Sequence, residues 1–225
     1  MSGNVIHLFF LLLTATGLLC CSKEGVPPVK PVCGAFTAPG VWKTFLCYNL
    51  GAADTEADPF TPDRVINGAY WQWGRSAQAA PGPSEMNPYT SVSGWIPFPN
   101  VAPDGSWTDS VKTGIDPCPD GYRVPSKAEW DGLIAHNIWS STGTWQESHT
   151  NYSSGMMVGD KLFLPAAGGR NSNNGVLELR GYSGHYWNST GGGSIAAWMM
   201  SFNCGGPGMA GYDRNYGASV RCVEE

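Results

Sequence analysis

The sequence is short of charged residues. Only 14 % of its 225 residues are charged, and the formal net charge is -5. Lys and Arg form no cluster, and the absence of a basic patch argues against nucleic acid as a partner. Disordered chains combine high net charge with few aromatic residues, whereas this chain holds 10 Trp and 30 Gly. The composition therefore predicts a loop-rich folded domain with a hydrophobic core.

The signatures of common enzyme classes are also absent. The sequence contains no Gly-x-Ser-x-Gly stretch, and His136, His149 and His185 show no metal-ligand spacing. The stretch "GGPGMAG" does fit Gly-x-Gly-x-x-Gly, but no helix pattern follows it, so it does not predict a dinucleotide site. We therefore expect no catalytic residue, no metal and no cofactor.

Long apolar runs are missing except near the N-terminus. Residues 5–19 are apolar but too short for a membrane span, and they lead into "LLCCSKEG". This pattern resembles the lipobox of bacterial lipoproteins, in which Cys21 is lipidated after cleavage; a plain secretory signal is the alternative. We expect a lipoprotein signal peptide over 1–20, a Pro-rich tether over 21–31 and one domain over 32–225.

That N-terminus also predicts a location. A lipid on Cys21 would hold the protein at a membrane of the cell envelope. We expect an outer membrane lipoprotein, with exposure on the cell surface as one of its possible orientations.

Five further cysteines belong to the expected domain: Cys33, Cys47, Cys118, Cys204 and Cys222. An exported chain enters an oxidising compartment, so pairing is expected, and an odd number leaves one cysteine over. Cys33 and Cys47 are close enough in sequence to cross-link the strands of one hairpin. A Cys118–Cys222 bond would close a long loop, which the chain-entropy model values at about 4–5 kcal/mol. Cys204 is then the expected unpaired residue, although spacing alone leaves the connectivity open.

One helix is well marked, near residue 126. In "VPSKAEWDGLIAHN", Ser126 and Glu129 form a capping box. Trp130, Leu133 and Ile134 follow at the spacing of one buried helical face.

Short apolar stretches around this helix predict strands separated by Gly and Asn turns. The expected strands are 41–50, 68–74, 161–168, 176–181, 185–189, 196–203 and 218–223. Residues 75–117 are rich in Pro, Gly, Ser and Asn and predict a long loop. The side chains expected to anchor this loop are Trp95, Phe98 and Trp107.

Several separated stretches resemble one family. "YWQWGRSA", "DPCPDGYRVPSKAEWDGL", "LFLPAAGGR", "GHYWNST" and "GASVRCV" are similar, in this order, to the Fibrobacter succinogenes major paralogous domain, over about Trp42 to Val223. That family resembles the C-type lectin and formylglycine-generating-enzyme folds. The resemblance implies an α+β, C-type lectin-like fold with one main helix, short, mostly antiparallel strands and long loops. It implies an exported or lipid-anchored protein and no particular reaction.

The two related folds suggest two activities to compare with the residues. Formylglycine-generating enzymes use a cysteine pair near the C-terminus, for which Cys204 and Cys222 are the candidates here. Cys222 lies in the expected last strand, however, where it would pair with Cys118. The Glu-Pro-Asn and Gln-Pro-Asp triplets of Ca²⁺-dependent lectins are absent.

The segment 181–223 has an unusual composition. It contains no Lys, Glu or Gln but many Gly, Ser, Asn and Tyr residues, the mixture that antibody paratopes use. These residue types are also reachable by randomising adenines in asparagine codons, so the segment resembles the variable end of target proteins of diversity-generating retroelements. A Gly-rich β domain of low charge is the alternative.

We therefore predict a non-catalytic binding surface for a protein or glycan in this segment. In "WMMSFN", alternation turns Ser201 and Asn203 outward, and the charges of Asp213 and Arg214 would keep the following turn at the surface. The predicted ligand-binding residues are Asn188, Ser194, Ser201, Asn203, Tyr212, Asp213, Asn215 and Tyr216. The alternative functions are an enzyme of the formylglycine-generating type and a structural envelope or fimbrial component.

Overall fold

The computed structural model describes residues 31–82 and 90–225. The predicted signal peptide, the lipidated Cys21 and most of the tether lie outside the described residues. Residues 31–225 form one compact unit. Within the described ranges, no helix has the length and apolar character to cross a membrane.

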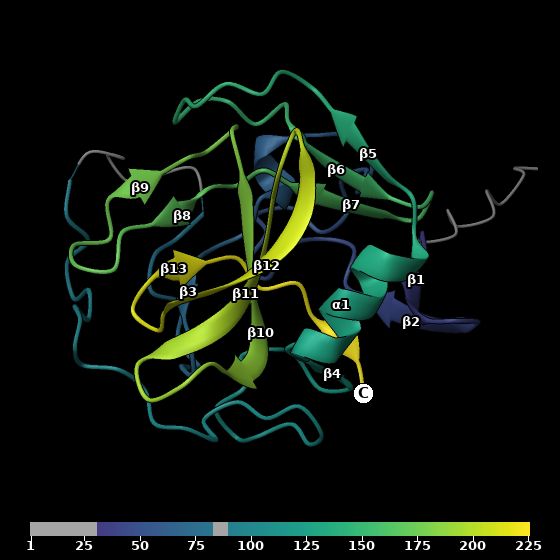
Figure 1. The fold of residues 1–225 in the computed structure, drawn as a ribbon. Coiled ribbons are helices and arrows are strands. Elements are labelled where there is room, and N and C mark those ends of the chain that lie inside the picture. The colour runs from purple at the N-terminus through teal and green to yellow at the C-terminus, as the bar shows by residue number, and fades with distance from the viewer. Residues whose placement is uncertain (1–30, 83–89) are drawn as a thin grey trace, which may run out of the picture. The chain divides into compact units, whose positions relative to one another are not determined.

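Short strands make up most of the regular structure (Figure 1). In chain order the elements are β1 (Cys33–Ala38), β2 (Val41–Phe45), the 3-10 helix η1 (Arg64–Ile66), β3 (Trp71–Gln72), β4 (Tyr122–Arg123), α1 (Lys127–His136), β5 (Trp139–Thr142), β6 (Gly155–Val158), β7 (Leu162–Pro165), β8 (Gly169–Arg170), β9 (Leu177–Glu178), β10 (Gly184–Gly191), β11 (Ala196–Asn203), β12 (Gly206–Asp213), β13 (Gly217–Ala218) and β14 (Val223–Glu224).

The fold class differs from the prediction. The described chain is mostly β, with 34 % strand and 7 % helix, and its strands form four small antiparallel sheets. The predicted α+β, C-type lectin-like fold with a main helix is therefore wrong. The capping box at Ser126 and Glu129 is present as predicted, but α1 has only 10 residues. One short helix cannot form a layer of its own, so strands and loops build most of the core.

The four sheets have different roles. The strand orders are β1-β2-β14-β4, β10-β11-β12, β3-β13-β8-β9 and β5-β6-β7. The first sheet joins the two ends of the domain, since Phe45 of β2 pairs with Cys33 on one side and with Val223 on the other. The second contains the longest strands, and the predicted binding segment runs through it.

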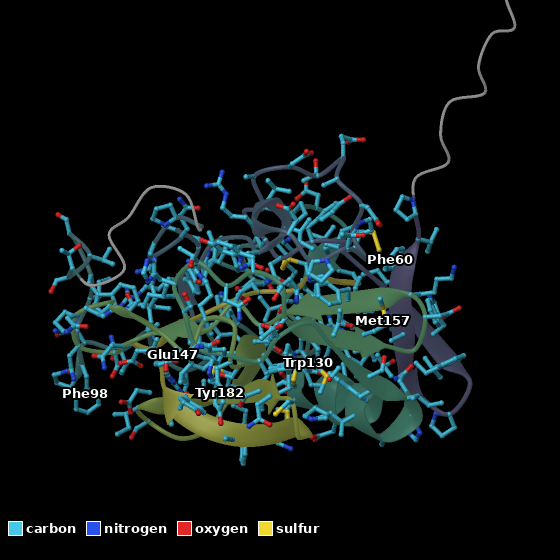
Figure 2. The ribbon with its side chains drawn as sticks, turned by 90° about the horizontal axis from the view of Figure 1, so that it is seen from above. Phe60, Phe98, Trp130, Glu147, Met157 and Tyr182 are labelled. Carbon is cyan, nitrogen blue, oxygen red and sulfur yellow. A yellow bond between two sulfur atoms is a disulfide. The ribbon has the colours of Figure 1, made fainter. Side chains whose placement is uncertain are left out.

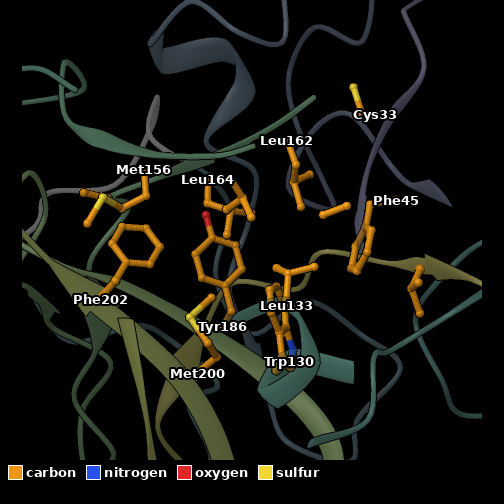
Figure 3. Packing of buried hydrophobic residues seen from close by; sticks show 14 residues of the cluster. Cys33, Phe45, Trp130, Leu133, Met156, Leu162, Leu164, Tyr186, Met200 and Phe202 are labelled. Atoms are coloured by element: carbon orange, nitrogen blue, oxygen red, sulfur yellow. The ribbon is translucent and has the colours of Figure 1, made fainter. Parts of the chain in front are cut away.

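The β10–β12 sheet is buried on part of both faces. On one face Tyr186 lies between Phe202 and Trp130 (Figure 3). The centroid of its ring is 5.9 Å from that of each neighbour. Trp130 and Leu133 of α1 are fully buried there, as the helical pattern predicted. On the other face a second cluster forms, with members that include Trp187, Met199, Trp73 and Trp107.

The long loop between β3 and β4 is held down mainly by its tryptophans. Trp107 is buried and Trp95 is half-buried, in agreement with their predicted role as anchors. Phe98 lies at the periphery in Figure 2 and is 41 % exposed, so the prediction that it is an anchor is wrong. The neighbouring Ile96 carbonyl accepts hydrogen bonds from the side chains of Gln72 and Asn215, and backbone contacts of this kind hold the loop instead.

Two disulfides cross-link the domain. Cys118–Cys222 spans 104 residues and is called the long-range disulfide below, and Cys33–Cys47 spans 14 and is called the hairpin disulfide. Both predicted pairs are confirmed. Cys204 is free and exposed, at the turn between β11 and β12.

The last predicted strand, 218–223, is interrupted. Only its ends are strands, in β13 and β14, although Val220 and Cys222 are buried as predicted. Between them the carbonyls of Val220 and Cys222 accept from Leu50 and Leu46 in the segment after β2, while the backbone of Ser219 bonds to β10. The segment is scaffold because it bonds to several elements rather than to one neighbouring strand.

Candidate functional site: a groove over the β11–β12 hairpin

The candidate site lies on the β10–β12 sheet near the β11–β12 turn. Antiparallel pairing places His185 of β10 opposite Ser201 of β11, and Ser201 opposite Gly208 of β12. Since side chains alternate along a strand, these three residues form one row on one face.

A groove of about 360 Å³ lies over this row. The hollow exists because β12 contributes almost no side-chain bulk on this face: a Cβ atom added to Gly206 or Gly208 would meet nothing within 4 Å. The loop before β10 also lines the groove, through Leu179, Tyr182 and Ser183, and Tyr182 is 43 % exposed. The lining residues are Leu179, Tyr182, Ser183, His185, Ser201, Phe202, Asn203, Gly206, Gly208, Met209, Ala210 and Tyr212.

His185 is the polar group at the base of the groove. Its side chain is almost completely buried, and its Nε2 lies 2.9 Å from the hydroxyl of Ser183. Burial lowers the pKa of His185 to about 4, so the imidazole is neutral at neutral pH. Tyr212 and Tyr216 pack edge-on to the ring, at centroid distances of 5.9 and 5.6 Å.

The second ring nitrogen of His185 is unsatisfied. Nδ1 is buried and has no hydrogen-bond partner within the described ranges. A buried polar atom left without a partner costs about 1–3 kcal/mol. Because Nδ1 is itself buried, a ligand group in the groove would reach it and remove this cost only if the side chains around the ring moved.

The predicted binding residues divide into three groups, of which two are accessible. Ser201, Asn203 and Tyr212 line the groove. Asp213 and Ser194 are exposed beyond it, Asp213 at the end of β12 and Ser194 in the turn between β10 and β11.

The other three predicted residues, Asn188, Asn215 and Tyr216, are buried, and the prediction that they are displayed is wrong. Asn188 Oδ1 accepts from the Thr190 amide within β10. Asn215 Nδ2 donates to the Ile96 carbonyl of the long loop. Tyr216 packs so closely on Gly169 that a Cβ there would lie 2.2 Å from its hydroxyl.

The charge of Arg214 does not keep its turn at the surface either. Arg214 is buried, and its guanidinium donates to the carbonyls of Ala102 at 2.7 Å and Ala196 at 3.0 Å. It also forms an ion pair with Asp104 and lies 4.3 Å from the centroid of the Trp73 ring. These contacts compensate for the cost of burying the charge. Arg214 thereby connects the long loop to the first residue of β11.

A smaller and more polar hollow of about 280 Å³ adjoins the groove through Leu179. Leu179 has a left-handed backbone with φ of 61°. The carboxylate of Glu147 accepts from its amide at 2.9 Å and helps to hold this conformation. Sequence reasoning overlooked Leu179, Tyr182 and Ser183, because loop residues carry no periodic pattern. Only the spacing Ser183-x-His185, which puts both side chains on one side of an extended chain, signals their proximity.

The glycine-rich stretch and the C-terminal cysteines have structural positions that differ from those in the enzymes they resemble. The stretch "GGPGMAG" belongs to the turn and strand β12, and no helix follows it. The Cys222 sulfur is bonded to Cys118, so Cys204 and Cys222 do not form a pair.

A protein-family model described as "Domain of unknown function (DUF8237)" matches residues 145–223. The match covers every residue that lines the groove, and less than half of the chain. Neither the curated proteins nor the solved structures contain a match to this chain.

Proposed function

We propose that the protein is a non-catalytic binding protein of the bacterial cell envelope, and that its ligand, a protein or glycan, sits in the groove over the β11–β12 hairpin. The observation that carries the proposal is the combination in one place of open space, the unsatisfied Nδ1 of the buried His185, the half-buried hydroxyl of Ser201 and the exposed amide of Asn203. The N-terminal pattern adds the anchor, a lipid on Cys21 at the outer membrane.

The same surface suits variation between related copies. Gly208 and Gly211 lie on opposite faces of β12, neither has a positive φ, and a Cβ at either position would meet nothing within 4 Å. Side chains can therefore be exchanged here without disturbing the packed scaffold. We propose that diversification, in the manner of retroelement target proteins, acts on the exposed residues around the groove.

The enzymatic alternative requires a different arrangement of cysteines. An enzyme of the formylglycine-generating type would need Cys222 to leave the long-range disulfide and reach Cys204. Titration of the folded domain with a thiol reagent separates the two functions: the binding protein should show a single reactive thiol, from Cys204, and the enzyme with its pair reduced should show three, from Cys118, Cys204 and Cys222.

Blocking the groove provides the direct test. Gly208→Arg places a long side chain at the groove, on a position where an added Cβ meets nothing within 4 Å. Gly114→Arg is the matched control, because Gly114 is also open and exposed but lies in the loop before β4. The probes are a glycan microarray and a displayed library of random peptides. We expect the unmodified protein and the control to bind the same probes and Gly208→Arg to lose at least about tenfold in affinity.

Two results would contradict the proposed site. One is a probe bound by the unmodified protein that Gly208→Arg binds equally well. The other is the absence of any bound probe, which would favour the structural envelope alternative.

A further inference from the structure

The outer edge of β12 has no neighbouring strand. β12 is the last strand of the β10-β11-β12 sheet, and within the described ranges the only backbone partners of Gly206–Tyr212 are those in β11. An uncovered strand edge is a template for another strand unless bulges, charges, proline or covering loops protect it, and Pro207 removes only one donor from this edge. The residues from Gly206 to Tyr212 carry no charge.

Pro207 indicates which backbone groups face outward. Proline has no N–H, and within a sheet it is found where that missing donor would have pointed away from the neighbouring strand. Pro207 pairs with Phe202 of β11, so the odd-numbered positions of β12 turn their backbone groups to the open edge. Met209 and Gly211 then offer both N–H and C=O there, while Gly208 and Ala210 bond to β11.

We propose that this edge binds an extended segment of a partner polypeptide, which adds to the sheet as a fourth strand and sends alternate side chains toward the groove. This inference rests on the proposed function, because it identifies the class of ligand for the same site. Backbone pairing along Met209 and Gly211 would supply affinity, and the groove would select the side chains.

A second copy of this chain fits the edge less well. If two β12 strands paired with each other, the positions facing the groove would again be Gly206, Gly208, Ala210 and Tyr212. Three of these four residues are small, so a paired copy would leave much of the hollow of about 360 Å³ unfilled. A glycan, in turn, has no regularly spaced backbone amides to match the free N–H and C=O groups of β12. A foreign strand with larger alternate side chains satisfies both the edge and the groove.

The test begins with peptides of random sequence. A phage-displayed library of random peptides is selected on the full chain in detergent and counter-selected on the Gly208→Arg variant. Amide hydrogen exchange is then followed with and without a selected peptide. We expect exchange at Met209 and Gly211 to slow by at least about tenfold, since new hydrogen bonds protect these amides. Gly208 and Ala210 should change little, because β11 already protects them.

A second measurement uses the peptide's own backbone. Methylating alternate amide nitrogens of the selected peptide should abolish binding for one set and spare the other, because strand residues alternate in direction. The inference is overturned if both sets behave alike, if exchange at Met209 and Gly211 is unchanged, or if no peptide survives counter-selection. Glycan binding lost in Gly208→Arg, with no peptide selected, would retain the groove as a site and reject the polypeptide ligand.

Discussion

Acid should destabilise this protein through one residue of the groove. Burial lowers the pKa of His185 from 6.5 to about 4, so the folded protein resists protonation at this ring while the unfolded chain accepts it. The unfolded state binds more protons between these two values. The stability supplied by neutral His185 is therefore complete above pH 6.5, falls as the pH drops and is lost below about pH 4. At about 1.4 kcal/mol per unit, the loss is about 3 kcal/mol.

The measurement compares the free energy of unfolding in urea from neutral pH down to about pH 4. His185→Gln removes the titrating ring and keeps a polar side chain that can bond to Ser183. We expect this variant to be less stable at neutral pH and to lose about 3 kcal/mol less than the unmodified protein over the acid range. Carboxyl groups also titrate in this range, for example Asp116, whose pKa is raised by burial. They titrate in both proteins, so their contribution cancels in the difference.

His136→Gln is the matched control, because His136 is exposed in the last turn of α1. The free energy of unfolding of His136→Gln should depend on pH as strongly as that of the unmodified protein. Equal slopes in His185→Gln and the unmodified protein would refute the reasoning, and would mean that His185 is protonated as easily in the folded state as in the unfolded one.

Three further predictions concern the scaffold and the anchor. Replacing both cysteines of the long-range disulfide by Ser should cost about 2–5 kcal/mol in urea unfolding, and more than the same change in the hairpin disulfide, because the longer loop restrains the unfolded chain more; an equal or smaller cost would contradict this. Arg214→Met should cost about 3–5 kcal/mol because it strips buried carbonyls of their donor, whereas Asp104→Asn, at a side chain 72 % exposed, should cost at most about 1 kcal/mol; similar losses in the two variants would show that the ion pair dominates. Mass spectrometry of membrane-extracted protein should find an acylated N-terminal Cys21, and an unmodified mature protein in the medium would refute the anchor.

Local signals in the sequence were the most informative. The capping box of α1 depends on residues three positions apart, so it could be read directly from Ser126 and Glu129. The expected oxidising compartment and the distribution of five cysteines favoured the two pairs, and the structure supplies the connectivity that spacing left open. The strength of one helix signal did not reveal how small a share of the fold that helix occupies, and this explains the wrong fold class.

The surroundings of residues 214–216 could not be read from the sequence. Arg214 and Asn215 are buried because carbonyls of Ile96, Asn100 and Ala102 accept their hydrogen bonds. These partners lie more than a hundred positions earlier, in a loop without regular pattern. Composition directed attention to the segment that contains β11 and β12, where the candidate groove lies, but it could not distinguish polar side chains that face the groove from those satisfied inside.

The first sheet has a consequence for protein engineering. Cys33 and Val223 both pair with Phe45, so the two ends of the folded domain lie about two strand spacings apart, roughly 10 Å. A domain whose ends meet in this way can be inserted into a loop of another protein or circularly permuted. The scaffold with its groove is thus a transferable module, which a host could carry between two neighbouring loop positions with only short linkers.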